Sequence, residues 1–298
     1  MEPDPSPTLK PWLQALGFTV AFLGLWLGIN IAVSLLLRPV ALLLNPDLLS
    51  ALSDPERLTE SLMTTGFLAS TTAASQVLGV LALGGLLWLL PPRATDRHAL
   101  TAQLAAHRPR LANLGLAALG GLTIGHLPGL AIEALASQLD AWGIDATSNL
   151  EILSSALVDT QSLAWPLMAF AVVVGAPVFE ELAFRGAMWD RFHRVQPAGS
   201  LVALLGTSAL FALYHADPLH IVGVLPIGLF LGLVRWRTGG LACCVVAHAA
   251  NNGLAVVMAL GLGTDFNLPL PAAVGAFVTA WLCLLPLRHR DRWAKHRQ

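Results

Sequence analysis

Long apolar blocks separated by short polar stretches run along almost the whole chain. One helical crossing of a bilayer needs about 20 mostly apolar residues, and eight blocks approach or exceed that length. Only helices can serve here, because an open sheet would leave backbone groups unpaired in lipid. The pattern predicts an all-α, polytopic transmembrane helical bundle with eight spans. These predicted spans are roughly residues 12–37, 62–90, 111–136, 163–187, 199–217, 219–236, 240–262 and 269–287.

The basic residues between these blocks predict an orientation. Lysine and arginine follow the second, fourth, sixth and eighth spans, whereas residues 138–161 contain neither. Basic connections stay in the cytoplasm, so we expect both termini there, with the protein in the inner membrane of a bacterial cell. Within 138–161, Leu150, Leu153 and Leu157 have helical spacing and predict an interfacial connector, with a lid over a substrate entrance as the alternative.

Composition agrees with a membrane protein and excludes one class of partner. The chain of 298 residues is 55% hydrophobic and 12% charged, with a mean hydropathy of +0.67. Soluble domains carry about twice that share of charge. A formal net charge of −1 gives no footprint for nucleic acid. Three cysteines, all within apolar blocks, form no CxxC pattern and are interpreted as packing residues.

The blocks divide the chain into four parts. Residues 1–11 are expected to be a short disordered cytoplasmic N-terminus, and residues 12–162 hold helices and loops without a signature. Residues 163–288 hold the remaining predicted helices. A basic cytoplasmic tail follows at 289–298.

Three ionisable residues interrupt the fourth predicted span: Glu180, Glu181 and Arg185. Each charge at bilayer depth costs roughly 2.5 kcal/mol or more, so the group needs a reason. Glu181 and Arg185 are four residues apart, on one helical face, where they can pair. Glu180 points about 100° away. It must therefore face another helix or a water-filled cavity, a setting that suits a general base.

Two later segments carry histidines. Phe211 lies one turn before His215 and would pack on the same face. His248 and Asn252 are also four residues apart, so one helix presents an imidazole and an amide in one direction. The alternatives are an interfacial histidine at position 215 and plain interhelical hydrogen bonding by the second pair.

Depth in the bilayer raises a difficulty for one shared site. His215 lies near the outer end of its span, whereas Glu180 lies toward the inner end of the preceding one. We expect a helix to be broken or shifted at Pro177 or at Pro218.

The three motifs, in this order, resemble the CPBP family, which comprises type II CAAX prenyl endopeptidases and bacteriocin-processing or immunity proteins and is also called Abi. Its pattern is EExxxR, then FxxxH, then HxxxN or HxxxD. The resemblance covers roughly residues 163–262. The matching residues are Glu180, Glu181 and Arg185, then Phe211 and His215, then His248 and Asn252.

This resemblance implies hydrolysis of a peptide bond within the membrane. It implies that residues 163–288 are a CPBP-like catalytic helical core, with the active site among the last four or five helices. Glu180 and His215 would position and activate a water, and His248 and Asn252 would stabilise the oxyanion. Glu181, Arg185 and Phe211 would support them. A rival account of the family makes it a metalloprotease, with zinc held by Glu180, His215 and His248. The chain has no HExxH motif, and we favour the glutamate mechanism without a cofactor.

Two other functions compete with a peptidase. Intramembrane acids and histidines also form proton relays in transporters, but transporters repeat such features in both halves, and here they cluster in spans four to seven. A non-catalytic immunity or scaffold member of the same family is the third possibility, against which the intact motifs argue. The substrate would be a membrane-associated protein or peptide. Prenylated tails, sorting anchors and bacteriocin-like peptides all fit, and we prefer a sorting or anchor segment. The sequence predicts no oligomeric state.

Overall fold

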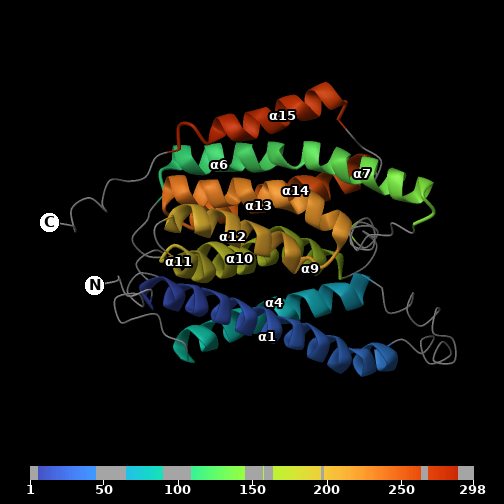
Figure 1. Cartoon of the computed structure of the whole chain (residues 1–298). Coiled ribbons are helices and arrows are strands. Elements are labelled where there is room, and N and C mark those ends of the chain that lie inside the picture. Colours follow the sequence, from blue (N-terminus) through green and yellow to red (C-terminus); the bar gives the residue numbers. More distant parts are fainter. Residues whose placement is uncertain are drawn as a thin grey trace, which may run out of the picture.

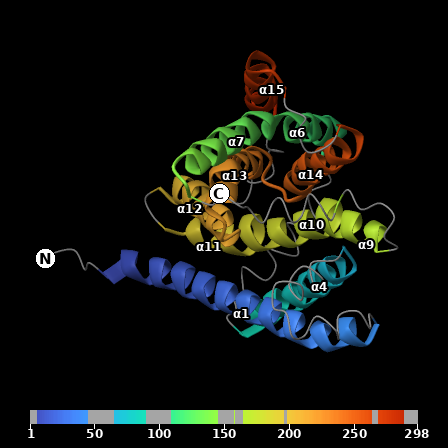
Figure 2. The same cartoon turned by 90° about the vertical axis from the view of Figure 1, so that its right-hand side faces the viewer.

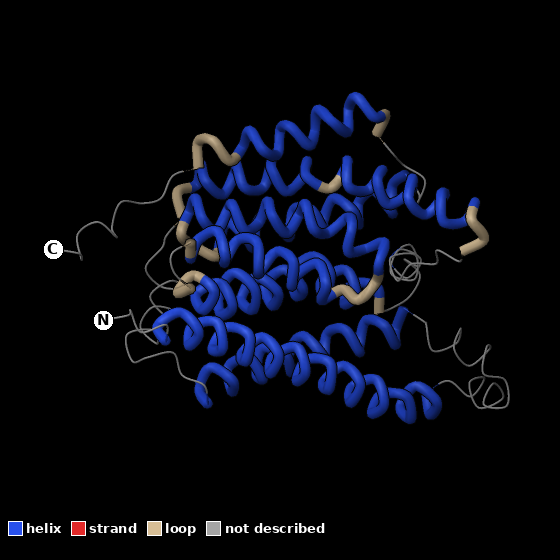
Figure 3. Tube along the Cα trace, viewed as in Figure 1, coloured by secondary structure: helices blue, strands red, loops and turns tan. Residues whose placement is uncertain are grey.

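The computed structural model describes residues 6–44, 65–89, 109–144, 157, 164–195, 198–262 and 268–287. Within these residues all regular secondary structure is helical, which confirms the predicted all-α bundle (Figures 1 and 3). The helices are α1 (Ser6–Leu44), α4 (Thr65–Leu89), α6 (Leu111–Ile124), α7 (His126–Ala141), α9 (Trp165–Phe170), α10 (Ala176–Glu181), α11 (Trp189–Phe192), α12 (Gly199–Tyr214), α13 (Pro218–Thr238), α14 (Ala242–Leu262) and α15 (Leu270–Cys283), with π-helical segments η2 (Ala171–Gly175) and η3 (Leu182–Met188).

Six helical stretches are long and apolar enough to cross a membrane, while α12 and α15 are shorter apolar helices. All eight correspond to predicted spans. The fourth extends further than predicted and ends at Phe192, and the fifth ends earlier, at Tyr214. The six long stretches are Leu9–Pro39, Phe67–Leu89, Leu111–Ala141, Trp165–Phe192, Pro218–Thr238 and Ala242–Leu260.

The bundle is layered (Figures 1 and 2). Helices α1 and α4 pair and pack against the fourth span, which runs from α9 to α11. Helices α12 to α14 lie at the centre, and α6, α7 and α15 cover the other side. Successive spans alternate in direction, so α1 begins and α15 ends at the same end of the bundle (Figure 1). The connections predicted to be cytoplasmic meet at that end. Its location in the cytoplasm stays a prediction.

The fourth span stays helical through Pro177, from Trp165 to Phe192, so the expected break is not found there. The irregularity takes the form of π-segments η2 and η3, which flank α10 and both of its glutamates. Such π-bulges are frequent at functional sites. Proline favours this irregularity because it has no backbone N–H to donate to the preceding turns.

A break separates α12 from α13. Ala216 has a left-handed backbone with φ 54°, and Pro218 then starts α13, where its missing N–H is tolerated. The Asp217 carboxylate caps this helix by accepting hydrogen bonds from the backbone N–H groups of Leu219 at 3.0 Å and His220 at 3.2 Å. His215 therefore lies in a tight turn next to a fixed helix start.

Several predictions concern residues outside the described part. They include Leu150 and Leu153 of the predicted connector, the tail 289–298 and residues 1–5. Residues 6–11, by contrast, were expected to be disordered and are helical, since α1 begins at Ser6. Pro7 is compatible with this start because proline is tolerated in the first helical turn.

Candidate active site

Four ionisable side chains are buried at the centre of the bundle. Glu181 and Arg185 have no exposed surface, and Glu180 and His248 are 8% and 5% exposed. Glu180 and Glu181 end α10, Arg185 lies in η3 and His248 lies in α14. Charges are almost never fully buried unless they are paired, so their partners define the site.

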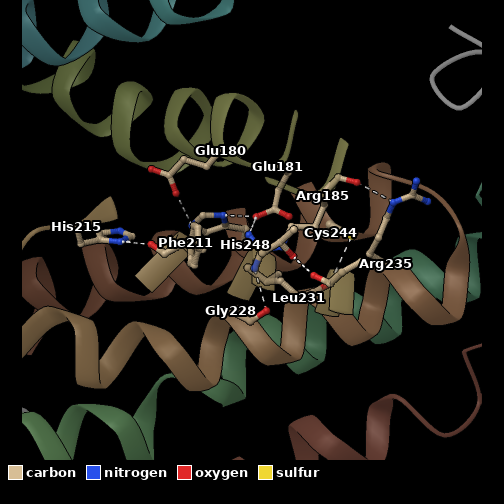
Figure 4. A network of polar contacts seen from close by, with 12 residues as sticks. Glu180, Glu181, Arg185, Phe211, His215, Gly228, Leu231, Arg235, Cys244 and His248 are labelled. Atoms are coloured by element: carbon tan, nitrogen blue, oxygen red, sulfur yellow. Dashed lines mark hydrogen bonds and ion pairs between the residues drawn. The ribbon is translucent and has the colours of Figure 1, made fainter. Parts of the chain in front are cut away.

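The two carboxylates flank one imidazole ring (Figure 4). His248 Nδ1 lies 3.0 Å from Glu181 Oε1, and its Nε2 lies 3.7 Å from Glu180 Oε2. A carboxylate that pairs with arginine only accepts, so Nδ1 donates to Glu181 and Nε2 faces Glu180. Neighbouring helical residues diverge by about 100°, and the ring from α14 lies between the two acids. The partner that the sequence left open for Glu180 is therefore His248.

Arg185 links this pair to the neighbouring helices. Its Nη1 donates to Glu181 Oε1 at 3.1 Å, which confirms the predicted pairing, and its Nη2 donates to the Gly228 carbonyl of α13 at 2.9 Å. The guanidinium carbon lies 4.4 Å from the centroid of the Phe211 ring, a cation–π geometry. Arg185 thus joins three helices around a single buried charge.

His215 lies on the other side of Phe211 from Glu181 (Figure 4). Its Nδ1 lies 2.9 Å from the Phe211 carbonyl oxygen, and because a carbonyl only accepts, Nδ1 carries the hydrogen. In the neutral ring Nε2 is then an acceptor. The Phe211 ring makes T-shaped contacts with both histidines, with centroid distances of 5.2 Å to His215 and 5.6 Å to His248. The predicted packing of Phe211 on His215 is confirmed.

Asn252, like His248, contacts the fourth span, but it reaches η2 instead of α10. Its Nδ2 donates to the Val172 carbonyl of η2 at 3.0 Å, and its Oδ1 accepts from Asn251 Nδ2 at 3.3 Å. Pro177 lacks the N–H that a π-turn would direct at Val172. The Asn252 amide therefore donates to a backbone carbonyl that has lost its donor within the fourth span. This structural role is separate from the catalytic role proposed for Asn252.

Arg235 is a site-supporting residue that the sequence analysis missed. It is 5% exposed; its Nε donates to the Arg185 carbonyl at 2.9 Å, and its Nη1 donates to the Gly239 carbonyl. The sequence analysis counted it only as a basic residue at the end of a span. One signal was available: Arg235 lies four residues before Gly239, whose φ of 69° ends α13.

The rival mechanism assigns zinc to Glu180, His215 and His248. Among the described residues, no group of three or more histidine, cysteine or acidic side chains is placed to hold a metal ion. One nitrogen of His215 bonds to Phe211, and one nitrogen of His248 bonds to Glu181. The choice between a glutamate mechanism and a metal mechanism stays a prediction.

With this geometry established, comparison with known proteins finds a family model that matches less than half of the chain. Residues 162–254 match the model described as type II CAAX prenyl endopeptidase Rce1-like. This segment is similar to the Rce1-like family. No curated protein and no solved structure matches the chain.

The Rce1-like segment confirms the resemblance inferred from the motifs. It runs from just before α9 into α14 and contains all seven motif residues. At the level of the family, the match supports a membrane-embedded protease that acts on a membrane-associated substrate. It leaves α1, α4, α6, α7 and α15 outside.

Proposed function

We propose that this protein is an intramembrane endopeptidase that cleaves a membrane-associated, lipidated or anchored protein with a water activated by Glu180. The observation that carries this proposal is the buried pair of Glu180 and the His248 ring inside the Rce1-like segment. A carboxylate and imidazoles held in a buried site are the groups that general acid–base hydrolysis needs.

The proposed reaction starts at Glu180. Its Oε2 lies 3.7 Å from His248 Nε2, beyond a direct hydrogen bond. We place the attacking water against this carboxylate. Glu180 removes a proton from this water while the water oxygen attacks the peptide carbonyl carbon. The C–N bond then breaks, and Glu180 returns the proton to the leaving nitrogen. His215 Nε2 is the second acceptor that positions the water.

Donors are needed for the negative charge that develops on the carbonyl oxygen. Asn252 has two side-chain N–H groups, one of which donates to Val172. The second is assigned to the oxyanion. His248 Nδ1 already donates to Glu181, so His248 donates to the oxyanion in its doubly protonated form. Preorganised donors of this kind are worth about 10²- to 10³-fold each in rate.

The remaining motif residues hold this arrangement. Glu181 fixes the ring of His248, Arg185 neutralises Glu181, and Phe211 packs between the two histidines. We propose that both termini lie in the cytoplasm, as the positive-inside rule predicts, and that the membrane is the inner membrane of a bacterial cell. For the substrate we favour a sorting or anchor segment over a prenylated tail.

Comparing membrane proteomes tests this function and does not require that the substrate be identified first. Cells lacking the protein are complemented with wild type, Glu180→Ala or the control Glu133→Ala, which alters an exposed acid of α7. The same uncleaved membrane protein should accumulate in uncomplemented cells and with Glu180→Ala, and should disappear with wild type and the control. Equal processing by Glu180→Ala would contradict the role of Glu180.

Chelation separates the two mechanisms. The purified protein should keep its cleavage activity after exhaustive chelation, with metal content near zero. Stoichiometric zinc that is lost together with activity would favour the rival mechanism.

A further inference from the structure

We infer that Trp26 of α1, outside the Rce1-like segment, is a positioning residue that aligns Glu180 with His215. This inference rests on the proposed function. Trp26 contacts Phe179 and Tyr214, which are the residues immediately before Glu180 and His215. A single side chain from the N-terminal helices therefore touches both backbone segments that carry the proposed acid–base pair.

The contact with Phe179 is a ring stack. The Trp26 and Phe179 centroids are 4.4 Å apart at an interplanar angle of 27°, and Phe179 is 1% exposed. Gly79 of α4 makes room for this stack, because a Cβ atom there would overlap both rings. The position of α10 is thus set by two aromatic rings and by a glycine of the neighbouring helix.

The contact with Tyr214 is a second ring contact. The Trp26 and Tyr214 centroids lie 5.9 Å apart at an interplanar angle of 35°. Tyr214 also makes a T-shaped contact with Phe184 at 5.5 Å. The end of α12 is thus packed between an aromatic ring of α1 and one of η3.

A second polar side chain from the layer of α1 and α4 contacts the fourth span. Gln76 of α4 donates from Nε2 to the Ala171 carbonyl of η2 at 3.1 Å, and its amide covers the bare backbone of Gly175. Apolar burial does not drive helices together in lipid, so specific packing and hydrogen bonds must. Trp26 and Gln76 supply such contacts, and only Trp26 connects with both Glu180 and His215 through their chain neighbours.

The predicted consequence lies in the chemical step. Phe179 and Tyr214 are bonded to the proposed catalytic residues, so a shift of either ring moves Glu180 relative to His215. A displacement of about 1 Å in an active site can cost about 10²-fold in rate. Loss of Trp26 should therefore lower kcat while KM for a lipidated peptide changes little.

The first test uses the full chain in lipid nanodiscs and an internally quenched, farnesylated CAAX peptide as the probe. Trp26→Ala should lower kcat about 10- to 100-fold. Trp26→Phe, which keeps a ring on Phe179, should recover most of that loss. The control is Trp88→Ala, which removes a tryptophan of α4 that is 68% exposed and should leave kcat unchanged.

A spectroscopic arm reports on the contact itself. Tyr214 is the only tyrosine in the chain, so 3-fluorotyrosine gives a single ¹⁹F resonance. Trp26→Ala removes the ring that lies against Tyr214 and should shift this resonance, whereas Trp88→Ala should not. An unchanged resonance in Trp26→Ala would overturn the contact.

A glycine pair keeps the test decisive if Trp26→Ala fails to fold. Gly79→Ala pushes a Cβ between the stacked rings and should lower kcat, while Gly84→Ala in the same helix meets no atom within 4 Å and should not. Equal kcat values for the members of each pair would overturn the inference. A wild-type protein that cleaves neither this peptide nor any cellular substrate would instead overturn the proposed function, and the ¹⁹F arm would still decide the contact.

Discussion

Two regions of the molecule differ in the side chains that they expose and bury: the layer of α1 and α4, and the Rce1-like segment. Leu13, Val20 and Leu81 on α1 and α4 are 61%, 70% and 65% exposed, as befits side chains that contact lipid. The Rce1-like segment instead buries Glu181, Arg185 and their partners. Lipid replaces protein as a neighbour for leucine, but it cannot replace the partner of a buried charge.

This contrast teaches where each region is sensitive. The α1–α4 layer depends on a few specific contacts, such as those of Trp26 and Gln76, and most of its surface can change without cost. In the Rce1-like segment buried polar groups bond to one another, from Glu181 to Arg185 and from Arg235 to the Arg185 carbonyl. Three buried atoms among the described residues have no hydrogen-bond partner: Glu181 Oε2, Arg185 Nε and Ser208 Oγ. Removing one member leaves the next unpaired.

Arg185→Leu should produce the largest effect on stability. It leaves Glu181 buried without its cation, and breaking a buried pair costs about 3–5 kcal/mol. The matched control is Arg237→Leu, which changes an exposed arginine at the end of α13. Unfolding in a denaturing detergent, followed by circular dichroism, measures the difference. Equal unfolding of the two variants would show that the buried network does not stabilise the segment.

Asn252→Ala should have an intermediate effect. The Val172 carbonyl loses its donor from α14, and interhelical hydrogen bonds in membranes are worth about 0.6–2 kcal/mol. The neighbouring variant Asn251→Ala keeps that bond and should unfold closer to wild type. If Asn251→Ala lowers the free energy of unfolding more than Asn252→Ala does, the bond from Asn252 to η2 does not hold α14 to the fourth span.

Leu81→Ala should have the smallest effect, because this side chain is 65% exposed on the lipid-facing side of α4. Exposed substitutions away from special features usually stay within about 0.5 kcal/mol. The same detergent titration applies. A loss comparable to that of Asn252→Ala would mean that this face packs against another protein surface.

Much of this contrast could be predicted from the sequence. Hydrophobic blocks define the spans, and spacing alone placed Arg185 on Glu181 and Phe211 on His215, because i, i+4 geometry is local. The bond from His248 to Glu181 was missed, since periodicity does not fix how one helix faces another. Trp26 and Gln76 were missed for the same reason: their partners lie more than 90 residues away in the chain. Pro177 predicted an irregularity in the fourth span, but the sequence did not predict the π-segments on both sides of α10.

The central claim is that Glu180 performs the chemistry inside this buried network. Single-turnover cleavage of a farnesylated CAAX peptide in nanodiscs by Glu180→Gln, compared with wild type and Glu133→Gln, tests it most directly. Glutamine keeps the size of the side chain and removes the base, so we predict a loss of at least about 10²-fold in the cleavage rate, with wild-type rates for Glu133→Gln. Cleavage by folded Glu180→Gln at the wild-type rate would contradict the account.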